Sequence, residues 1–327
     1  MKKKAFSFEK MQRLTTLLIL VVIMIVLSLV SSKYFTYSNL INIVRQESAV
    51  IIIASAATIL MISGGMDLSP AGVMALTSVI LAKLCVAGIP LPVSILLSLF
   101  VGLISGLFSG LLVVIANVPP MIATLGTWYI TKGLAYVASN SYAIVQGLPK
   151  NFSWVIRNVG PFPLIVVIAA VIFVIFYIIL NKTLLGKYAY AIGGNAETAR
   201  LSGVPVRRVR CILYILTGLM GAVAGVLMSS RISSGDPNLS TSGIEFEIIV
   251  AIILGGTSLM GGQGSLIGSL IGALILGNLS NGMNLLGIGS VYQFIVEGAV
   301  LIVAVVVDLI LKGNSEKLKK KEALRKK

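Results

Sequence analysis

The chain has 327 residues, of which 57% are apolar and only 11% are charged, and its mean hydropathy is +1.01. Soluble domains carry about a quarter charged residues, so this composition excludes a soluble globular protein and also an intrinsically disordered one. The net charge is +15 and the chain has no His, which excludes a His-based proton relay, a Ser-His-Asp triad and a His-ligated metal.

The apolar runs predict an all-α polytopic membrane protein with about ten transmembrane helices, because a spanning helix needs about 20 apolar residues. The first run, 14–30, follows a basic start and could be a signal peptide, but no clear cleavage site follows it, and the later spans favour a retained helix. The other spans are expected at 48–63, 71–89, 91–116, 121–139, 162–180, 211–229, 245–261, 265–285 and 291–311, with polar loops at 31–47 and 140–161. Eight spans, with two short ones re-entrant, would fit the charges equally well.

The basic residues are concentrated in three blocks that hold 19 of the 26 Lys and Arg. These blocks are a cytoplasmic N-terminal segment 1–13, a loop 181–210 within the transmembrane domain 14–311, and a tail 312–327. Ten spans place all three on the cytoplasmic side together with both termini, as the positive-inside rule requires. The charge therefore indicates membrane lipid as the surroundings, and no nucleic acid is expected as a partner.

Glycine recurs every fourth residue in several spans, which lets neighbouring helix backbones approach closely. We expect these residues to pack helices: Gly102, Gly106, Gly110, Gly221, Gly225, Gly264, Gly268 and Gly272. A second glycine pattern, G-G-x-[DS]-L, occurs at 64–68 and at 255–259. Five residues do not establish an internal repeat, but such breaks predict unwound backbone at membrane depth, where protein or a watery cavity must satisfy it.

Catalytic chemistry has no candidate in this sequence. Gly186-Lys187 is not followed by Ser or Thr, so there is no P-loop, and neither paired carboxylates nor a nucleophile elbow is present. No catalytic residue, metal or cofactor is therefore predicted. Ionisable residues inside spans are functional candidates by default. Glu297 lies deepest in its span. The full set is Lys83, Lys132, Glu247, Glu297 and Asp308.

Uncharged polar residues are the better candidates for a translocation path, since amides and hydroxyls match the hydroxyls of a neutral polyol or sugar. Together with Asp67 of the first glycine-rich break, the path is expected to include the uncharged residues Ser69, Asn117, Thr124, Asn281, Asn284 and Gln293. Interhelical hydrogen bonding is the alternative for each of them and is favoured for any single one.

The loop 181–210 is too patterned for a simple connector. Residues 196–202 can form a short helix that begins at Asn195 as N-cap, carries Glu197 in its first turn, and is bounded by Gly193-Gly194 and by Gly203. A capped helix protruding from a membrane bundle suits docking of a soluble partner, whereas a solvated positive-inside loop would need only the charges.

These residues carry a family resemblance. Glu197-Thr198-Ala199, with Gly203 six residues after the Glu, resembles the E-A-A-x-x-x-G coupling loop of ABC-importer permeases, which packs into a cleft of the ATPase. Segments 64–69, 123–127, 190–195, 199–204, 255–262 and 281–286 resemble the ribose-type monosaccharide permease family, in the same order along about 35–310. Two residues depart from the family pattern. Thr198 stands where the family usually has Ala, and Pro70 stands where it often has Val. The resemblance assigns the coupling loop to Gly193, Gly194, Asn195, Glu197, Ala199, Arg200 and Gly203.

The resemblance implies a permease in the bacterial cytoplasmic membrane, paired with a second permease subunit that is identical or different. A cytoplasmic ABC ATPase would bind ATP and Mg, and an external sugar-binding protein would deliver ribose or a similar pentose or hexose. Two alternatives remain: a permease of this architecture for a nucleoside or a branched-chain amino acid, and a proton- or sodium-driven secondary transporter. Only the last would need no ATPase.

Overall fold

The computed structural model describes residues 2–241, 243–289, 291–296, 298–300, 302, 303 and 306, with side chains from residue 14 onward. The N-terminal basic block has no described side chains, and Glu297, Asp308 and the tail 312–327 lie outside the described residues. The elements are α1 Lys2–Val30, α2 Tyr37–Ile62, α3 Pro70–Val86, α4 Leu91–Val114, α5 Pro120–Ser139, η1 Trp154–Ile156, β1 Asn158–Val159, β2 Phe162–Pro163, α6 Leu164–Lys182, α7 Leu184–Gly194, α8 Ala196–Leu201, α9 Val206–Ile232, η2 Pro237–Ser240, α10 Ile244–Leu254 and α11 Leu266–Leu285.

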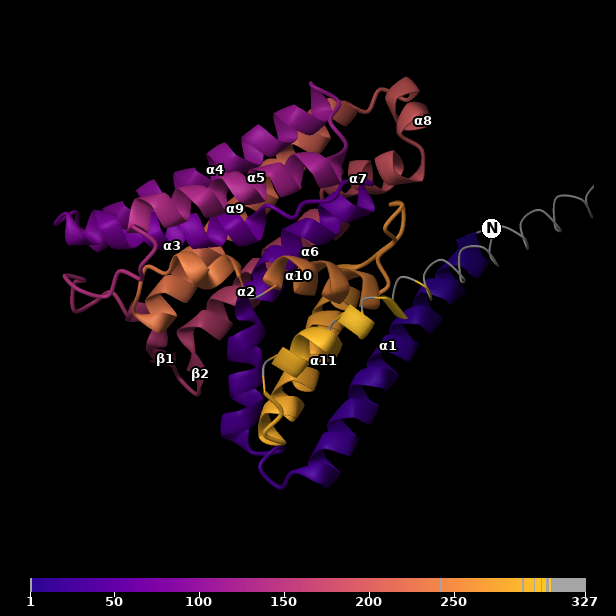
Figure 1. Ribbon diagram of the computed structural model, residues 1–327. Coiled ribbons are helices and arrows are strands. Elements are labelled where there is room, and N and C mark those ends of the chain that lie inside the picture. Colours follow the sequence, from indigo (N-terminus) through magenta and orange to yellow (C-terminus); the bar gives the residue numbers. More distant parts are fainter. Residues whose placement is uncertain are drawn as a thin grey trace, which may run out of the picture.

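The helices form two groups that meet along α2 and α9. In one group α3, α4, α5 and α9 pack together, and in the other α1 and α10 pack against α11, which lies beside α2. The strands β1 and β2 make a small antiparallel hairpin before α6 (Figure 1). The protein is therefore an all-α membrane protein, as its composition predicts.

Helix α2 lies at the centre of the bundle, and every residue from Glu47 to Ile62 is buried. Its apolar surface is not confined to one face, which is typical of a helix surrounded by other helices. The groups on either side of α2 are consequently held to one shared core.

Glycine contacts between helices confirm the packing prediction. A Cβ at Gly102 would lie 2.4 Å from the carbonyl oxygen of Gly218, and one at Gly106 would lie 2.5 Å from that of Tyr214, so α4 and α9 touch through their backbones. Gly272 approaches Ala251 of α10 in the same way. Gly264, by contrast, precedes α11 in an extended turn, so it is not part of that helix face.

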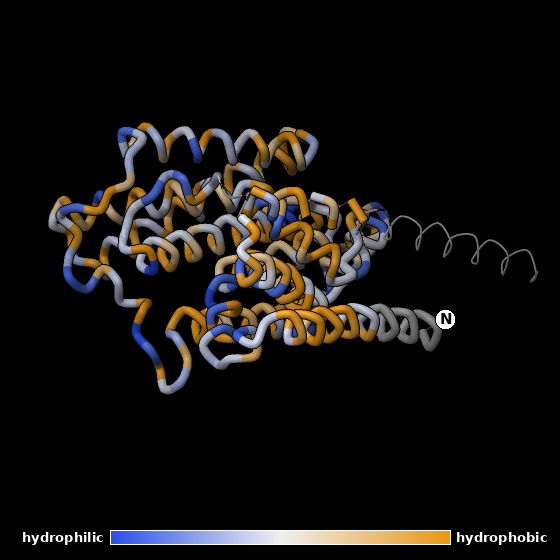
Figure 2. Tube along the Cα trace, turned by 60° about the horizontal axis from the view of Figure 1, so that its bottom comes forward, coloured by the Kyte–Doolittle hydropathy of each residue, from blue (hydrophilic) through white to orange (hydrophobic). Residues whose placement is uncertain are grey.

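Among the described residues, α2, α4, α6, α9 and α11 are long and apolar enough to cross a membrane. Segment 14–30 and α3 are apolar but shorter. Most hydrophilic segments, blue in Figure 2, lie in the connections between helices, while hydrophobic residues cover the helices themselves. Large apolar side chains also stand exposed on α4 and α6, such as Phe100 and Val174. This distribution fits lipid as the surrounding medium.

Several predicted boundaries are wrong, including the start of α9, which begins at Val206 inside the expected loop. Helix α2 begins at Tyr37, within the expected loop, because Thr36 caps its first turn by accepting from the amide of Asn39. The expected span 245–261 ends at Leu254, where two glycines stop α10. The loop 181–210 contains α7 in addition to the predicted short helix.

Candidate functional site

Two glycine-rich turns interrupt the bundle, one after α2 and one after α10. At the first, Gly65 N donates to Leu60 O (3.0 Å) and Gly64 N to Met61 O (2.9 Å), while Gly64 adopts φ +78°. These are the two bonds of a Schellman motif, which ends a helix at a left-handed residue. Residues 63–69 then run without regular helical structure until α3 begins at Pro70.

The second turn has the same chemistry. Thr257 N donates to Ile252 O (3.1 Å) and Gly256 N to Ile253 O (2.8 Å), and Gly256 has φ +86°. The left-handed position is the first glycine of the pair in 64–65 but the second in 255–256, so the two G-G-x-[DS]-L segments do not superimpose residue by residue. Both segments end a helix, and this shared role explains their similar sequences without an internal repeat.

Helix α9 supplies the hydrogen bonds that the unwound stretch 63–69 needs. Arg210 Nη2 donates to the carbonyl oxygen of Ser63 (3.1 Å), and the Tyr214 hydroxyl donates to that of Met66 (3.3 Å). Thr217, one turn further, donates to the carboxylate of the next residue, Asp67. Side chains of α9 thus replace helical bonds that this stretch of backbone lacks.

Asp67 is buried and fixes the start of α3. Its Oδ1 accepts from both the amide (2.9 Å) and the hydroxyl (2.7 Å) of Ser69, while Thr217 occupies Oδ2. Each carboxylate oxygen therefore has a partner inside the protein. The predicted path residues Asp67 and Ser69 consequently join α9 to the first turn of α3.

Arg210, Tyr214 and Thr217 are not among the site residues that the sequence predicts. They are spaced i, i+4 and i+7 on α9, which places them on one face of that helix. That spacing was a usable signal, but it does not reveal which distant backbone the face meets.

The predicted short helix exists as α8. Asn195 caps it by accepting from the amide of Thr198 (2.9 Å), and Ala199 is its buried contact with the bundle. Arg200 donates to Glu197 at 2.5 and 3.0 Å, and this bond lowers the pKa of the Glu197 carboxyl. Both side chains are exposed, so the pair adds little stability.

Gly203 ends α8 in a third Schellman motif. Its amide donates to Arg200 O (3.0 Å), the amide of Val204 donates to Ala199 O (3.0 Å), and φ at Gly203 is +84°. No atom of the described residues lies within 4 Å of a Cβ built there. The glycine is needed for its backbone conformation and not for close packing within this chain. Gly193 and Gly194 form the last turn of α7, directly before the cap.

The polar residues of α11 pair between helices. Asn281 exchanges two hydrogen bonds of 2.9 Å with Asn39 of α2, and Gln293 Nε2 donates to Asn284 Oδ1 (2.8 Å). Tyr34 donates to Asn278 in the same region. Asn281 and Asn284 thus bond between helical segments, while Asn278 bonds to Tyr34 in the turn before α2.

The remaining path residues lie elsewhere. Thr124 is buried and bonds within α5 to Pro120 O (2.9 Å), and Asn117 is exposed between α4 and α5 with φ +55°. The structure therefore does not gather the seven predicted residues at one place. Two ionisable residues are also accommodated locally: Lys83 Nζ donates to Ala138 O (2.8 Å), and Lys132 lies 4.7 Å from the Trp128 ring.

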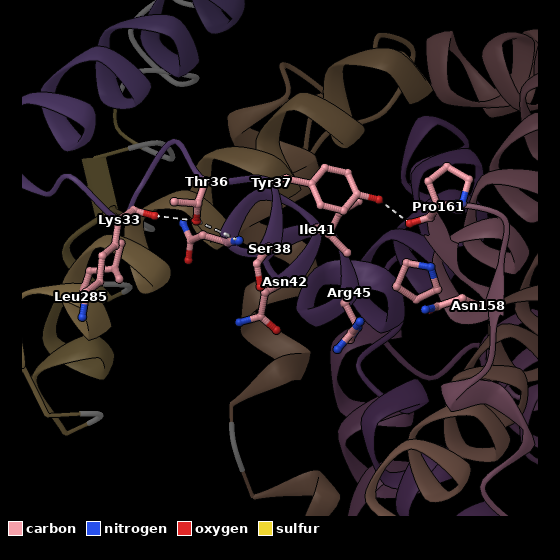
Figure 3. A pocket seen from close by; sticks show the side chains of 12 residues that line it. Lys33, Thr36, Tyr37, Ser38, Ile41, Asn42, Arg45, Asn158, Pro161 and Leu285 are labelled. Atoms are coloured by element: carbon pink, nitrogen blue, oxygen red, sulfur yellow. Dashed lines mark hydrogen bonds between the residues drawn. The ribbon is translucent and has the colours of Figure 1, made fainter.

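A polar cavity of about 550 Å³ opens beside the first turns of α2. Figure 3 shows Asn42 and Arg45 of α2 on one side and Asn158 of the hairpin on the other, with Tyr37 reaching across to the carbonyl of Pro161. The cavity and the Gly64 turn lie at opposite ends of α2, which spans about 39 Å at 1.5 Å per residue.

Comparison with known proteins assigns a family to this architecture. The pattern of the family described as "branched-chain amino acid transport system / permease component" matches residues 39–305. The chain is 39% identical over 303 residues to the ribose import permease protein RbsC of Bacillus subtilis, covering 91% of this chain and 93% of that protein. It is 36% identical over 317 residues to the probable ABC transporter permease protein YphD of Escherichia coli, covering 97% and 95%. It is 34% identical over 307 residues to the L-arabinose transport system permease protein AraH of Escherichia coli, covering 94% and 93%.

Proposed function

The chain belongs to this family of transport-system permease components, and from that premise we propose that it is the membrane subunit of an ATP-driven importer for a monosaccharide. Membership confirms the resemblance carried by its motifs, and the protein is a multi-pass protein of the bacterial inner membrane. The similarity to a ribose permease over 91% of the chain carries the proposal. Ribose or a similar pentose or hexose is the substrate class that we assign.

The partners follow from this assignment. A separate ABC ATPase binds ATP and Mg and docks on α8, and an external sugar-binding protein delivers the solute. A second permease subunit, identical or different, completes the path. The exposed, capped helix α8 supports the docking assignment because Glu197 and Arg200 present charged groups to solvent while Ala199 anchors the helix.

The proposed topology has ten spans and both termini in the cytoplasm, with 1–13 and 312–327 as cytoplasmic extensions of the domain 14–311. The polar cavity beside α2 then faces outward, and α8 faces the cytoplasm. In a background without Cys85 and Cys211, Tyr142→Cys should react with an impermeant thiol reagent in intact cells, since Tyr142 is 78% exposed. Leu201→Cys, 75% exposed on α8, should react only after permeabilisation. Labelling of Leu201→Cys in intact cells would overturn this orientation.

The function is tested in proteoliposomes that contain the permease, its ATPase and its sugar-binding protein. We expect uptake of one monosaccharide that depends on ATP and on the binding protein. A nucleoside or a branched-chain amino acid as the transported solute would correct the substrate class. Uptake that a proton or sodium gradient drives in the absence of ATP would refute the importer class.

The path itself should bind sugar weakly, because tight binding inside a channel becomes a barrier to release. Asp67, Asn281 and their neighbours already have partners within the protein, which supports this view. Calorimetry of the isolated permease should therefore detect no tight sugar binding. A tight site in the permease alone would place selectivity here and not in the binding protein.

A further inference from the structure

Three segments of the chain meet at the carbonyl of Ile62, the last residue of α2. The amide of Gly262 donates to this carbonyl oxygen at 2.8 Å. A Cβ at Gly193 would lie 1.9 Å from the same oxygen and 2.3 Å from the nitrogen of Gly262. The end of α2, the last turn of α7 and the segment 255–265 therefore touch through backbone atoms at this point.

A second contact ties α7 to the same segment. The Tyr190 hydroxyl donates to the carbonyl oxygen of Gly264 at 2.7 Å, and Tyr190 lies one turn before Gly193 on α7. Gly261 also approaches Gly64, since its Cβ would lie 2.8 Å from the Gly64 nitrogen. One face of α7 thus holds segment 255–265, which in turn rests against the turn that ends α2.

These contacts are positioned to carry motion. Only Asn195 separates α7 from α8, and its side chain caps α8, so a displacement of α8 acts directly on the last turn of α7. The Ile62 turn leads to Asp67 and the start of α3, and segment 255–265 joins α10 to α11. Backbone atoms in contact have no rotamers to absorb a shift, and packed interiors transmit strain.

We propose that Gly193 is the contact through which movement of α8 reaches both interrupted helix pairs, α2–α3 and α10–α11. This inference rests on the proposed docking of an ATPase at α8. Gly193 acts here as a positioning residue: its missing side chain lets α7 press directly on the Ile62 carbonyl and the Gly262 amide. Both helix pairs then move together when the ATPase shifts α8.

Gly193→Ala and Gly194→Ala form a matched pair on consecutive residues of α7. Neither glycine has a positive φ, so both positions accept Ala conformationally. The new methyl group would force apart Ile62 and Gly262 in the first variant, whereas no atom of the described residues lies within 4 Å of a Cβ at Gly194. The two variants add the same group and differ in what it meets.

The assay measures ATP hydrolysis by the assembled complex with and without the sugar-loaded binding protein. Gly193→Ala should reduce the stimulated rate about tenfold, as overpacking of a tight contact of this size predicts, and so lower the ratio of the stimulated to the basal rate. Maximal sugar uptake should fall while the half-saturating sugar concentration stays unchanged. Gly194→Ala should keep the wild-type ratio of stimulated to basal hydrolysis.

The outcomes separate this inference from the proposed function. Equal stimulation of Gly193→Ala and Gly194→Ala would overturn the role of Gly193. If Gly193→Ala does not assemble, Tyr190→Phe decides, since it removes the hydroxyl that bonds to Gly264. A reduced ratio of stimulated to basal hydrolysis supports the inference, and an unchanged ratio overturns it. Absence of stimulation in the wild-type complex would instead refute the proposed function, and the inference with it.

Discussion

Replacement of Gly203 by Asn, Ala and Val should impair transport in that order, from mild to severe. At φ +84° the residue after α8 occupies the left-handed region, which glycine adopts freely. An ordinary L residue loses about 1–2 kcal/mol there, Asn loses less, and a β-branched residue is a marked outlier. A Cβ at this position meets no atom of the described residues within 4 Å. The volume of the new side chain should therefore cause no clash within this chain.

The size of the effect follows from the small stability of α8. This helix has six residues and one buried residue, Ala199, so most of the strain appears as loss of its native conformation. A cost of about 1–2 kcal/mol corresponds to about a 5- to 30-fold decrease in the native population. Gly203→Ala should therefore reduce stimulated ATP hydrolysis by about that factor, and Gly203→Val should abolish uptake.

The assay is ATP hydrolysis stimulated by the sugar-loaded binding protein, at equal amounts of permease in the membrane. Sugar binding by the external protein alone serves as a control, since the substitutions do not touch it. The backbone argument would be wrong if Gly203→Ala were more active than Gly203→Asn. That order follows side-chain size and would indicate close packing against the ATPase.

Three further predictions concern the bundle. Gly106→Ala should lower the free energy of unfolding by about 1–3 kcal/mol, because its Cβ would meet the Tyr214 carbonyl at 2.5 Å. Gly133→Ala, whose Cβ meets no described atom within 4 Å, should not lower the thermal unfolding temperature in detergent, since Ala favours a helix over Gly; equal destabilisation by the two variants would contradict the packing argument. A double-mutant cycle of Asn39→Ala and Asn281→Ala should show a coupling of about 0.6–1.7 kcal/mol, the range for hydrogen bonds between membrane helices; additive effects would mean that the pair does not join α2 to α11. Asn284→Ala should slow maximal uptake more than it raises the half-saturating sugar concentration, and the reverse result would place a sugar contact at this amide.

Local sequence determined the class of the protein and the ends of its short elements. The apolar runs and clustered Lys and Arg established a helical membrane protein because the cost of burying charge in lipid acts on every segment separately. Helix α8 was predictable because its cap, Asn195, and its terminator, Gly203, lie within a few residues of the bonds they make. The glycine spacing on α4 likewise indicated close helix packing without naming the partner.

Tertiary structure alone decided which distant segments meet. The bonds from Arg210, Tyr214 and Thr217 to residues 63–67 join positions about 150 apart in sequence, and nothing in either segment specifies the other. The close contacts of Gly193 could not be read from the sequence either. Its neighbour Gly194 is also a glycine, yet a Cβ there would meet no atom of the described residues within 4 Å. The polar residues of α11 matched a sugar path by composition, yet Asn281 is satisfied by Asn39. An amide bonds equally well to a sugar hydroxyl or to another amide, so only the folded arrangement of the helices selects the partner.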